Sequence, residues 1–427
     1  MQQAVSLSPE WRLLLRACAG RGLTDADLAL CQTRGVPFDW QSLVKTASQH
    51  DIGPRLYHSL RACPLPDAAA GAAMAVVEAQ YYATGLRNAL LERELHRILD
   101  DWRVAGVPAI VLKGSALTAT VYGNRALRPM RDLDVLVQPS DMATVRELMA
   151  ASGYEIDPNQ RDRIDWYYGH HYHLAFQKRS GTEGAVRCEV HWRLERPGRP
   201  FSIDTAGLWA RAVTVNAGQR DIQVLSPEDT LLHLALHVCK HRLAGGFRAF
   251  CDIAAVIAAS GSRFDWEQVC RRASEWRVAD LVHVPILITD RLLNAGVPSG
   301  VAARLAGGDV DERLIDAAVT EALTERVGAT LFPEFLTLCY GASLAERTRT
   351  VGRVLARAAR GSEPLRPAWS YYPGRIGHVL RIYGAQLWRF SRQRQRAMAE
   401  VDRRKRLAAW LTPFSDDQAV ASHSSAL

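Results

Sequence analysis

The spacing of apolar residues predicts helices through roughly the first 105 residues. "LSPEWRLLLRAC" places serine, proline and glutamate ahead of leucines, which is typical of a helix start. In "GLRNALLERELHRILDDW" apolar residues recur at three- and four-residue steps, and charges occupy the other face: Leu86, Leu90, Leu91, Leu95, Ile98 and Leu99. The "AGVP" that follows ends this helix. The pattern therefore predicts an N-terminal helical region over residues 1–105.

From Val107 the pattern changes to short strands separated by helices. "VPAIVL" predicts a strand, "ALTATVYG" a helix, and "RDLDVLV", residues 131–137, a strand with period-2 alternation. The next helix has Ser140 as its expected N-cap and Gly153 as its expected end. "HYHLAFQKR" and "AVRCEVHWRL" flank the turn "SGTEG" and predict a β-hairpin. These elements form a compact mixed core over residues 106–200.

The chain becomes helical again after a connection that contains Pro197 and Pro200. From residue 226 onward the pattern is helical, so residues 201–412 are expected to form a C-terminal helical domain. The last stretch, 413–427, is small and polar and is predicted to be disordered. The predicted fold class is α+β, with a small mixed sheet flanked by N-terminal and C-terminal helical regions.

Composition places the chain among globular proteins without a membrane span. Of its 427 residues 48% are hydrophobic and 23% charged. No apolar run approaches the ~18–20 residues that cross a bilayer, and no basic segment precedes the N-terminal leucines as in a signal peptide. We expect a cytoplasmic protein. Eight cysteines are spread without CxxC spacing, which argues against a disulfide framework or a structural zinc site and favours buried thiols.

The positive charge of the chain is concentrated in residues 375–406. The formal net charge is +8, and this segment has ten Arg/Lys against two acids, Glu400 and Asp402. Its first half is amphipathic. One interpretation is a surface for an anionic partner, nucleic acid or acidic lipid, and another is a docking helix for a protein. The alternative is a helix packed by its apolar stripe, with its arginines solvated.

Two aspartates interrupt the strand at 131–137. Asp132 and Asp134 are one residue apart, so on a strand both carboxylates leave the same face. Four polar residues share one face of the second hairpin strand: Arg187, Glu189, His191 and Arg193. If the two strands are neighbours, Glu189 supplies a third carboxylate. Such carboxylates repel one another, and oxygen ligands favour Mg²⁺ or Mn²⁺, so a pair of ions is predicted. The alternative is an acidic, exposed sheet edge.

A phosphate site is expected beside these carboxylates. Lys113, Gly114 and Ser115 end the first strand and begin a helix. Gly114 allows close approach of the backbone to a ligand, Ser115 offers a hydroxyl, and a helix N-terminus favours phosphate. Lys113 adds charge unless it is merely solvated. Arg128 and Arg131 flank the aspartate strand and are further candidates to meet phosphate.

The motifs "VLKGSAL", "RDLDVLV" and "CEVHW" resemble the bacterial uncharacterised nucleotidyltransferase family of the DNA polymerase β-type superfamily. The resemblance covers about residues 100 to 255. Carried over position by position, the phosphate signature and the metal ligands fall on five residues: Gly114 and Ser115, Asp132 and Asp134, and Glu189. The sequence departs from the family in two ways: sixteen residues separate Ser115 from Asp132, and the third acid is a glutamate.

The resemblance implies a polymerase β-like core that moves a nucleoside monophosphate from an NTP to an acceptor by a two-metal mechanism. The acceptor is not readable from the sequence, whether small molecule, sugar, peptide, protein or RNA end. Two alternatives stay open. One is a protein-nucleotidylating enzyme of the toxin–antitoxin type, although the flanking regions are long for that class. The other is a non-catalytic nucleotide-binding or assembly module on the same fold.

Histidines near the core allow further interpretations. Three lie on one face of a predicted helix: His233, His237 and His241. A zinc site is weighed there against a half-buried face that looks into the cleft, and "HLALHVCKH" lacks the glutamate of a metalloprotease motif. Substrate contact is assigned to four residues: His191, His237, Lys240 and Asp252. For "GHHYHLAF" (His170, His171 and His173), a strand-edge position is favoured over a metal site.

Overall fold

The computed structural model describes most of the chain, in two units. The described residues are 7–20, 22–28, 38–63, 68–180, 184–218, 220–243, 245–307, 311–324 and 394–414. The larger unit holds the described residues up to 324 together with 410–414, and the smaller unit holds 394–409. All of the candidate site residues lie in the larger unit.

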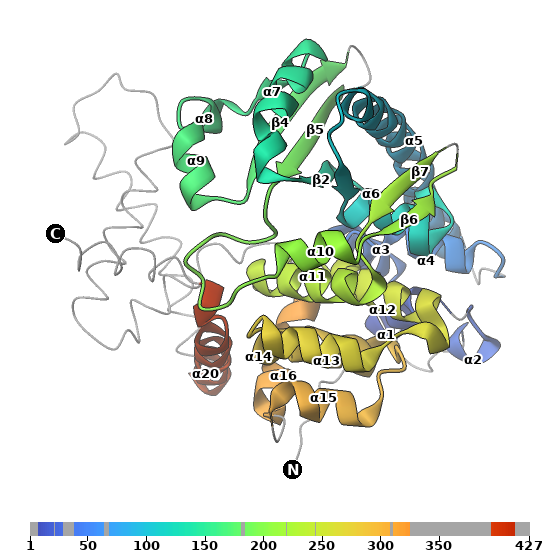
Figure 1. Ribbon diagram of the computed structural model, residues 1–427. Helices are drawn as coiled ribbons and strands as arrows, with labels where there is room; N and C mark the ends of the chain where they lie inside the picture. Colours follow the sequence, from blue (N-terminus) through green and yellow to red (C-terminus); the bar gives the residue numbers. More distant parts are fainter. Residues whose placement is uncertain are drawn as a thin grey trace, which may run out of the picture. The chain divides into compact units, whose positions relative to one another are not determined.

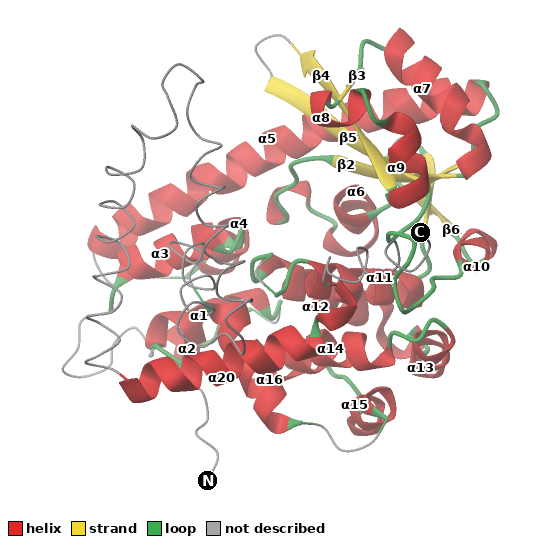
Figure 2. Cartoon of the chain, turned by 90° about the vertical axis from the view of Figure 1, so that its left-hand side faces the viewer, coloured by secondary structure: helices red, strands yellow, loops and turns green. Residues whose placement is uncertain are grey.

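The N-terminal region is helical, as predicted. Its helices are α1 (Pro9–Cys18), α2 (Asp25–Leu28), α3 (Trp40–Gln49), α4 (Gly53–Leu60) and α5 (Ala68–Val104). The Ser8 hydroxyl caps α1 by accepting a hydrogen bond from the backbone N–H of Trp11 at 3.3 Å. The 37-residue α5 reaches from α3 and α4 to the strands, which Figure 2 shows clearly.

Seven strands form one mixed sheet in the order β3-β4-β5-β2-β1-β7-β6. Figure 1 shows β4 and β5 side by side in this sheet. The strands are β1 (Ala109–Val111), β2 (Leu133–Val137), β3 (Glu155–Ile156), β4 (His173–Ser180), β5 (Gly184–His191), β6 (Val213–Asn216) and β7 (Asp221–Val224). The β2–β5 and β1–β7 pairs are parallel, and the other pairs are antiparallel. The predicted hairpin is confirmed as β4 and β5, and β5 lies beside β2 as expected.

The sheet also extends beyond the predicted core. Residues 201–225 were expected within a helical domain, but they contain β6 and β7, and β7 pairs with β1 through Val111 and Val224. Each strand has only four residues, so the alternation is too short to be distinguished locally. The expected N-cap Ser140 is wrong, because Pro139–Asp141 form a 3₁₀ turn and the helix starts at Met142. Gly153, with a φ of 79°, ends that helix as predicted.

Short helices connect the strands. They are α6 (Lys113–Leu117), the π-helix η2 (Thr118–Tyr122), η3 (Arg125–Leu127), η4 (Pro139–Asp141), α7 (Met142–Ala151), α8 (Pro158–Arg161), α9 (Ile164–His170) and α10 (Thr205–Ala210).

One face of the sheet packs into an apolar core with α5 and α7. The helices contribute seven residues to this core: Leu91, Leu95, Ile98, Trp102, Met142, Val145 and Met149. The strands β2 and β5 contribute six: Leu133, Val135, Val137, Val186, Cys188 and Val190. Because side chains alternate along a strand, the residues between them point to the opposite face. That opposite face carries Asp134, Glu189 and His191, which places the polar face as the sequence predicts.

Helices follow the sheet in the C-terminal part. They are α11 (Pro227–Lys240), α12 (Arg248–Ser260), η6 (Gly261–Arg263), α13 (Trp266–Glu275), α14 (Ala279–Leu293), α15 (Ser299–Ala306), α16 (Glu312–Leu323), α20 (Arg394–Trp410) and η8 (Thr412–Phe414). Within the described ranges no helix combines the length and apolarity needed to cross a membrane. The six cysteines there are free, and five of them are buried, as expected.

The basic segment 375–406 is described only in part. Its residues 394–406 lie in α20, and residues 375–393 lie outside the described residues. Most of the predicted disordered tail, 415–427, also lies outside them. Phe414, however, is buried and its ring lies 5.5 Å from that of Phe201. The readings of the segment as an anionic-partner surface or a docking helix stay predictions.

Candidate active site

The register of the sheet brings the predicted carboxylates together. Asp134 of β2 is directly opposite Glu189 of β5 in the parallel pair. Asp132 immediately precedes β2, which begins at Leu133 rather than at 131 as expected. The charges of Asp132 and Asp134 both raise the pKa of Glu189, after the larger effect of burial. The three carboxylates therefore share one electrostatic environment at this face of the sheet.

Asp134 is the most enclosed of the three and is already paired. It is 4% exposed, and its Oδ1 accepts a hydrogen bond from Lys113 Nζ at 2.6 Å and lies 3.0 Å from His191 Nε2. Burial alone raises the pKa of Asp134, but the Lys113 charge and the His191 hydrogen bond hold it well below the usual range. Asp134 is thus a buried carboxylate with a cation seated on it.

Asp132 and Glu189 are less well compensated. Burial and the charge of Asp134 raise the pKa of Asp132, and burial and Asp134 do the same for Glu189. Glu189 forms an ion pair with Arg187, whose Nη2 donates to Oε1 at 3.2 Å. Three acids facing Lys113 and Arg187 leave one negative charge unmatched among these five groups.

Lys113 joins β1 to the segment that was predicted to bind phosphate. It follows β1 by two residues and opens α6, with a φ of 45° in the left-handed region. Burial lowers its pKa, but Asp134 and Glu189 outweigh burial, so the pKa of Lys113 is raised and its ammonium stays charged. The expectation of a strand followed directly by a helix at Lys113 is confirmed, and this lysine is paired rather than solvated.

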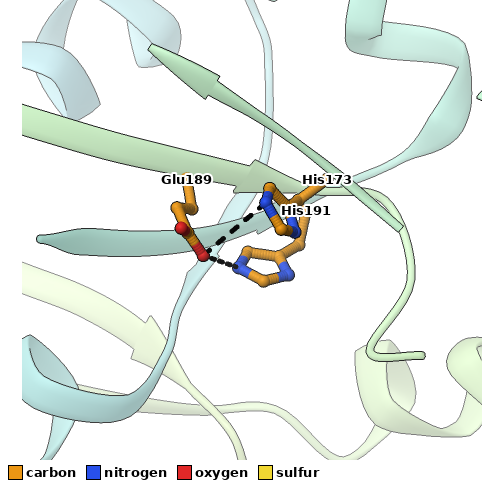
Figure 3. A group of neighbouring side chains, drawn as sticks. All are labelled: His173, Glu189 and His191. Atoms are coloured by element: carbon orange, nitrogen blue, oxygen red, sulfur yellow. Dashed lines mark ion pairs between the residues drawn. The ribbon is translucent and has the colours of Figure 1, made fainter. Parts of the chain in front are cut away.

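Two imidazoles complete the polar cluster around Glu189. Its Oε2 lies 3.8 Å from Nε2 of His173 and 3.8 Å from Nε2 of His191 (Figure 3). The two histidines are themselves opposite each other in the β4–β5 pair. Burial, ahead of neighbouring charges, lowers the pKa of His191 to about 4 and also lowers that of His173. Both rings are therefore neutral near pH 7, and His173 is a buried residue rather than the expected strand-edge residue.

Gly114 and Ser115 are packed against the protein. A Cβ on Gly114 would lie 2.5 Å from Nη1 of Arg128 and 2.7 Å from Sδ of Met130, so only glycine fits. The Ser115 side chain is 9% exposed, and its hydroxyl points to Met130 Sδ at 3.8 Å. A sulfur is a weak acceptor. The role of both residues in phosphate binding stays a prediction.

The two flanking arginines lie in different surroundings. Arg128 is buried in a bidentate ion pair with Asp252, and the Tyr122 hydroxyl donates to the same carboxylate at 2.6 Å. Arg131 is largely exposed and pairs with Asp51 at 3.1 Å. Arg128 and Asp252 therefore hold each other, which leaves Arg128 less available for phosphate and Asp252 less available for substrate.

The helix α11 lines two small cavities beside Lys113. One is bounded by Lys113, Arg128, His237, His241, Arg248 and Asp252, among others. The other is bounded by Lys113, Tyr172, His191, His233, His237 and Lys240, among others. Lys113 and His237 line both. The expected histidine face of this helix therefore does look toward the site.

Lys240 is a cation with an unusual environment. Its Nζ lies 3.5 Å from the centroid of the Tyr172 ring and 3.7 Å from Glu195 Oε2. Burial lowers the pKa of Lys240 to about 8. Tyr172 and Glu195 were not among the residues that sequence analysis singled out. Tyr172 precedes β4 by one residue, and no motif marks either of them.

Comparisons with known proteins agree with the motifs. A family model described as an uncharacterised nucleotidyltransferase matches residues 36–294, well over half of the chain. The solution structure of antibiotic-resistance factor ANT(2'')-Ia is similar at 13% sequence identity and a TM-score of 0.32, over 44% of this chain and 92% of that one. No curated protein matches the sequence. The family match includes all of the candidate site residues and excludes the basic segment 375–406.

Proposed function

The chain belongs to the uncharacterised nucleotidyltransferase family, and on that premise we propose that it transfers a nucleoside monophosphate from an NTP to an acceptor hydroxyl. The observation that carries the proposal is the register of β2 and β5, which sets Asp134 opposite Glu189 beside Asp132. Lys113, seated on Asp134, supplies the nearest positive charge for a phosphate.

The donor set fits divalent cations that prefer oxygen. Asp132, Asp134 and Glu189 offer carboxylate oxygens, and their mutual repulsion, expressed in the raised pKa values of Asp132 and Glu189, would be relieved by a cation. We assign Mg²⁺ or Mn²⁺ to these three residues. When bound, two such ions stabilise the attacking and leaving oxygens of a phosphoryl displacement.

The residues of the chain would then bind and orient the NTP and would accept the proton of the acceptor hydroxyl. The acceptor oxygen forms a bond to the α-phosphorus while the bond from that phosphorus to the bridging oxygen breaks, and pyrophosphate leaves with the electron pair. Glu189, opposite Asp134 in the sheet, takes the proton of the acceptor hydroxyl. Lys113 would exchange Asp134 for a phosphate oxygen. Gly114 and Ser115 remain the proposed phosphate cradle, while His237 and Lys240 line the adjoining cavities.

The experiment that tests the proposal uses two labels on the same NTP. The purified chain is incubated with Mg²⁺ or Mn²⁺, candidate acceptors, and each NTP labelled either at the α- or at the γ-phosphate. Nucleotidyl transfer places the α label on an acceptor and releases the γ label as pyrophosphate. Asp134→Asn should abolish the transfer, while Asp165→Asn, a substitution of an exposed residue on α9, should not. Transfer of the γ label, or equal activity in Asp134→Asn, would overturn the proposal.

A non-catalytic nucleotide-binding module is the second candidate, and the Lys113–Asp134 pair favours it. That contact neutralises one predicted metal ligand without a metal. Calorimetry distinguishes the two. A module binds NTP equally with and without Mg²⁺, whereas the proposed enzyme binds NTP more tightly with it. No binding of any of the four NTPs would contradict both.

A further inference from the structure

We propose that His173, Glu189 and His191 form a binding site for a transition-metal ion, such as Zn²⁺, at the edge of the carboxylate cluster. This inference does not depend on nucleotidyl transfer, because it concerns metal binding alone. It differs from the assignment of Mg²⁺ or Mn²⁺ to Asp132, Asp134 and Glu189, since two of the three ligands are imidazoles.

The geometry is close to that of an occupied site. Glu189 Oε2 is 3.8 Å from both imidazole nitrogens, and one ligand atom from each residue lies within 4.8 Å of the others (Figure 3). Zinc binds imidazole and carboxylate at roughly 2.0–2.2 Å, so two of its ligands sit about 3–3.5 Å apart. Side-chain rotations would bring the three atoms onto one ion, and the ion would replace the hydrogen bond between His191 Nε2 and Asp134, with the imidazole proton moving to Nδ1.

The sheet holds these ligands in place. His173 faces His191 across the antiparallel β4–β5 pair, and Glu189 precedes His191 by two residues on the same face of β5. All three side chains therefore come from two adjacent, hydrogen-bonded strands. Among the described residues, His173, Glu189 and His191 are the group of histidine and acidic residues whose ligand atoms all lie within 4.8 Å of one another.

The chemistry of the donors selects the metal. Two imidazoles and one carboxylate suit zinc and other first-row transition metals, whereas Mg²⁺ prefers oxygen ligands. Such a set leaves a position open for water or substrate. Glu189 meets the imidazoles through Oε2, while its Oε1 accepts a hydrogen bond from Arg187.

A second observation also points to a ligand. His173 and His191 are 7% and 1% exposed, yet Nδ1 of each ring is buried without a hydrogen-bond partner among the described residues. A buried polar atom without a partner usually has an explanation. With no hydrogen bond at Nδ1 to set the tautomer of His173, that ring is free to present a lone pair at Nε2 toward Glu189.

The test is direct metal binding to the full chain, free of tags and stripped with a chelator. Zn²⁺ binding is measured by calorimetry, and Co²⁺ binding by its visible absorption bands. We expect one tight site, with Zn²⁺ favoured over Mg²⁺. His173→Phe, which keeps an aromatic ring of similar bulk, and His191→Ala should each weaken Zn²⁺ binding by roughly tenfold or more.

The controls separate this inference from the proposed function. His170→Ala, on the exposed imidazole stacked on Trp166, should leave Zn²⁺ affinity unchanged. Asp132→Asn should abolish nucleotidyl transfer but retain the Zn²⁺ site. If wild type binds Zn²⁺ no more tightly than Mg²⁺, or if folded His173→Phe binds Zn²⁺ as wild type does, the inference is wrong. Zn²⁺ binding without any transfer would leave the inference standing and contradict only the proposed function.

Discussion

Arg128 and Asp252 are 124 residues apart in sequence and are joined by three hydrogen bonds of 2.9–3.1 Å. They are 6% and 2% exposed. The pair ties the segment that leads into β2 to α12, and through Tyr122 it also reaches η2. The position of β2 therefore depends on a contact with a helix outside the predicted core.

Removing one partner of the Arg128–Asp252 pair should destabilise the folded protein. Asp252→Asn leaves the Arg128 guanidinium buried without its counter-charge, and we expect a loss of about 3–5 kcal/mol in the free energy of unfolding. Urea unfolding at pH 7 measures it. Glu267→Gln, which breaks an exposed pair with Arg304, is the matched control and should leave the free energy of unfolding nearly unchanged. Equal losses in the two variants would contradict the structural role of the Arg128–Asp252 pair.

Gly114→Ala should destabilise the fold. The added Cβ meets Arg128 and Met130 at 2.5 and 2.7 Å, and overpacking of this kind costs about 1–3 kcal/mol. Gly71→Ala, on the exposed side of α5 with open space around it, should instead be neutral or stabilising by up to about 1 kcal/mol. Thermal unfolding compares the two. A Gly114→Ala protein as stable as wild type would show that Arg128 and Met130 can move to accommodate the added methyl group at little cost in stability.

Asp132→Asn and Asp134→Asn should have opposite effects on stability. From the sequence alone, removal of either charge is expected to leave the fold intact or stabilised. Asp132 fits that expectation, since burial and the charge of Asp134 raise its pKa. Asp134→Asn instead leaves the Lys113 ammonium, 2.6 Å away, without its carboxylate and should cost about 1.5–3 kcal/mol. The measurement is urea unfolding at pH 7 with chelator present, and a stabilised Asp134→Asn protein would refute the Lys113 contact.

Glu94 should contribute stability that is lost in acid. Burial opposes it, but hydrogen bonds from Arg97, Lys178 and Tyr154 lower the pKa of Glu94 from 4.5 to about 2. Because the pKa of Glu94 is lower in the folded state, ionised Glu94 stabilises the folded protein fully above pH 4.5. This contribution to the free energy of unfolding disappears as the pH falls from 4.5 toward 2. Because solvent screens this half-buried group, we expect about 1–2 kcal/mol.

The measurement for Glu94 is the urea midpoint of wild type and Glu94→Gln at pH 7 and pH 3. The gap between the two proteins should be large at pH 7 and should narrow at pH 3. Glu147→Gln, an exposed substitution on α7, should follow wild type at both values. A gap that is independent of pH would indicate that Glu94 acts by packing alone.

The local pattern of apolar residues was sufficient to predict β2 and β5, but it was insufficient to predict contacts between segments that are distant in sequence. β2 and β5 each place one face in the core, so alternation of apolar residues revealed both of them, together with Asp134 and Glu189 on the other face. The pairing of β1 with β7 and of Arg128 with Asp252 joins segments more than a hundred residues apart. No local periodicity contains that information.

The histidine partner of Glu189 was missed for a related reason. Whether His173 or Tyr172 faces His191 depends on hairpin register, and the longer turn "SGTEG" does not set register as a two-residue turn does. The surroundings of Lys113 were equally hard to predict. The sequence showed that Lys113 follows a strand, but whether its ammonium is solvated or pairs with Asp134 depends on the tertiary packing around the sheet.

The order of strands in the sheet bears on how the protein is made on the ribosome. Asp132, Asp134 and Glu189 are synthesised well before β7, yet β1, which lies between β2 and β7, keeps an open edge until residues 221–224 emerge. Asp252, the counter-charge of Arg128, emerges later still. A nascent chain therefore carries all three carboxylates while its sheet is incomplete, with an unpaired strand edge exposed to other chains. Chaperone dependence during synthesis should accordingly be greatest between the release of β5 and the release of α12.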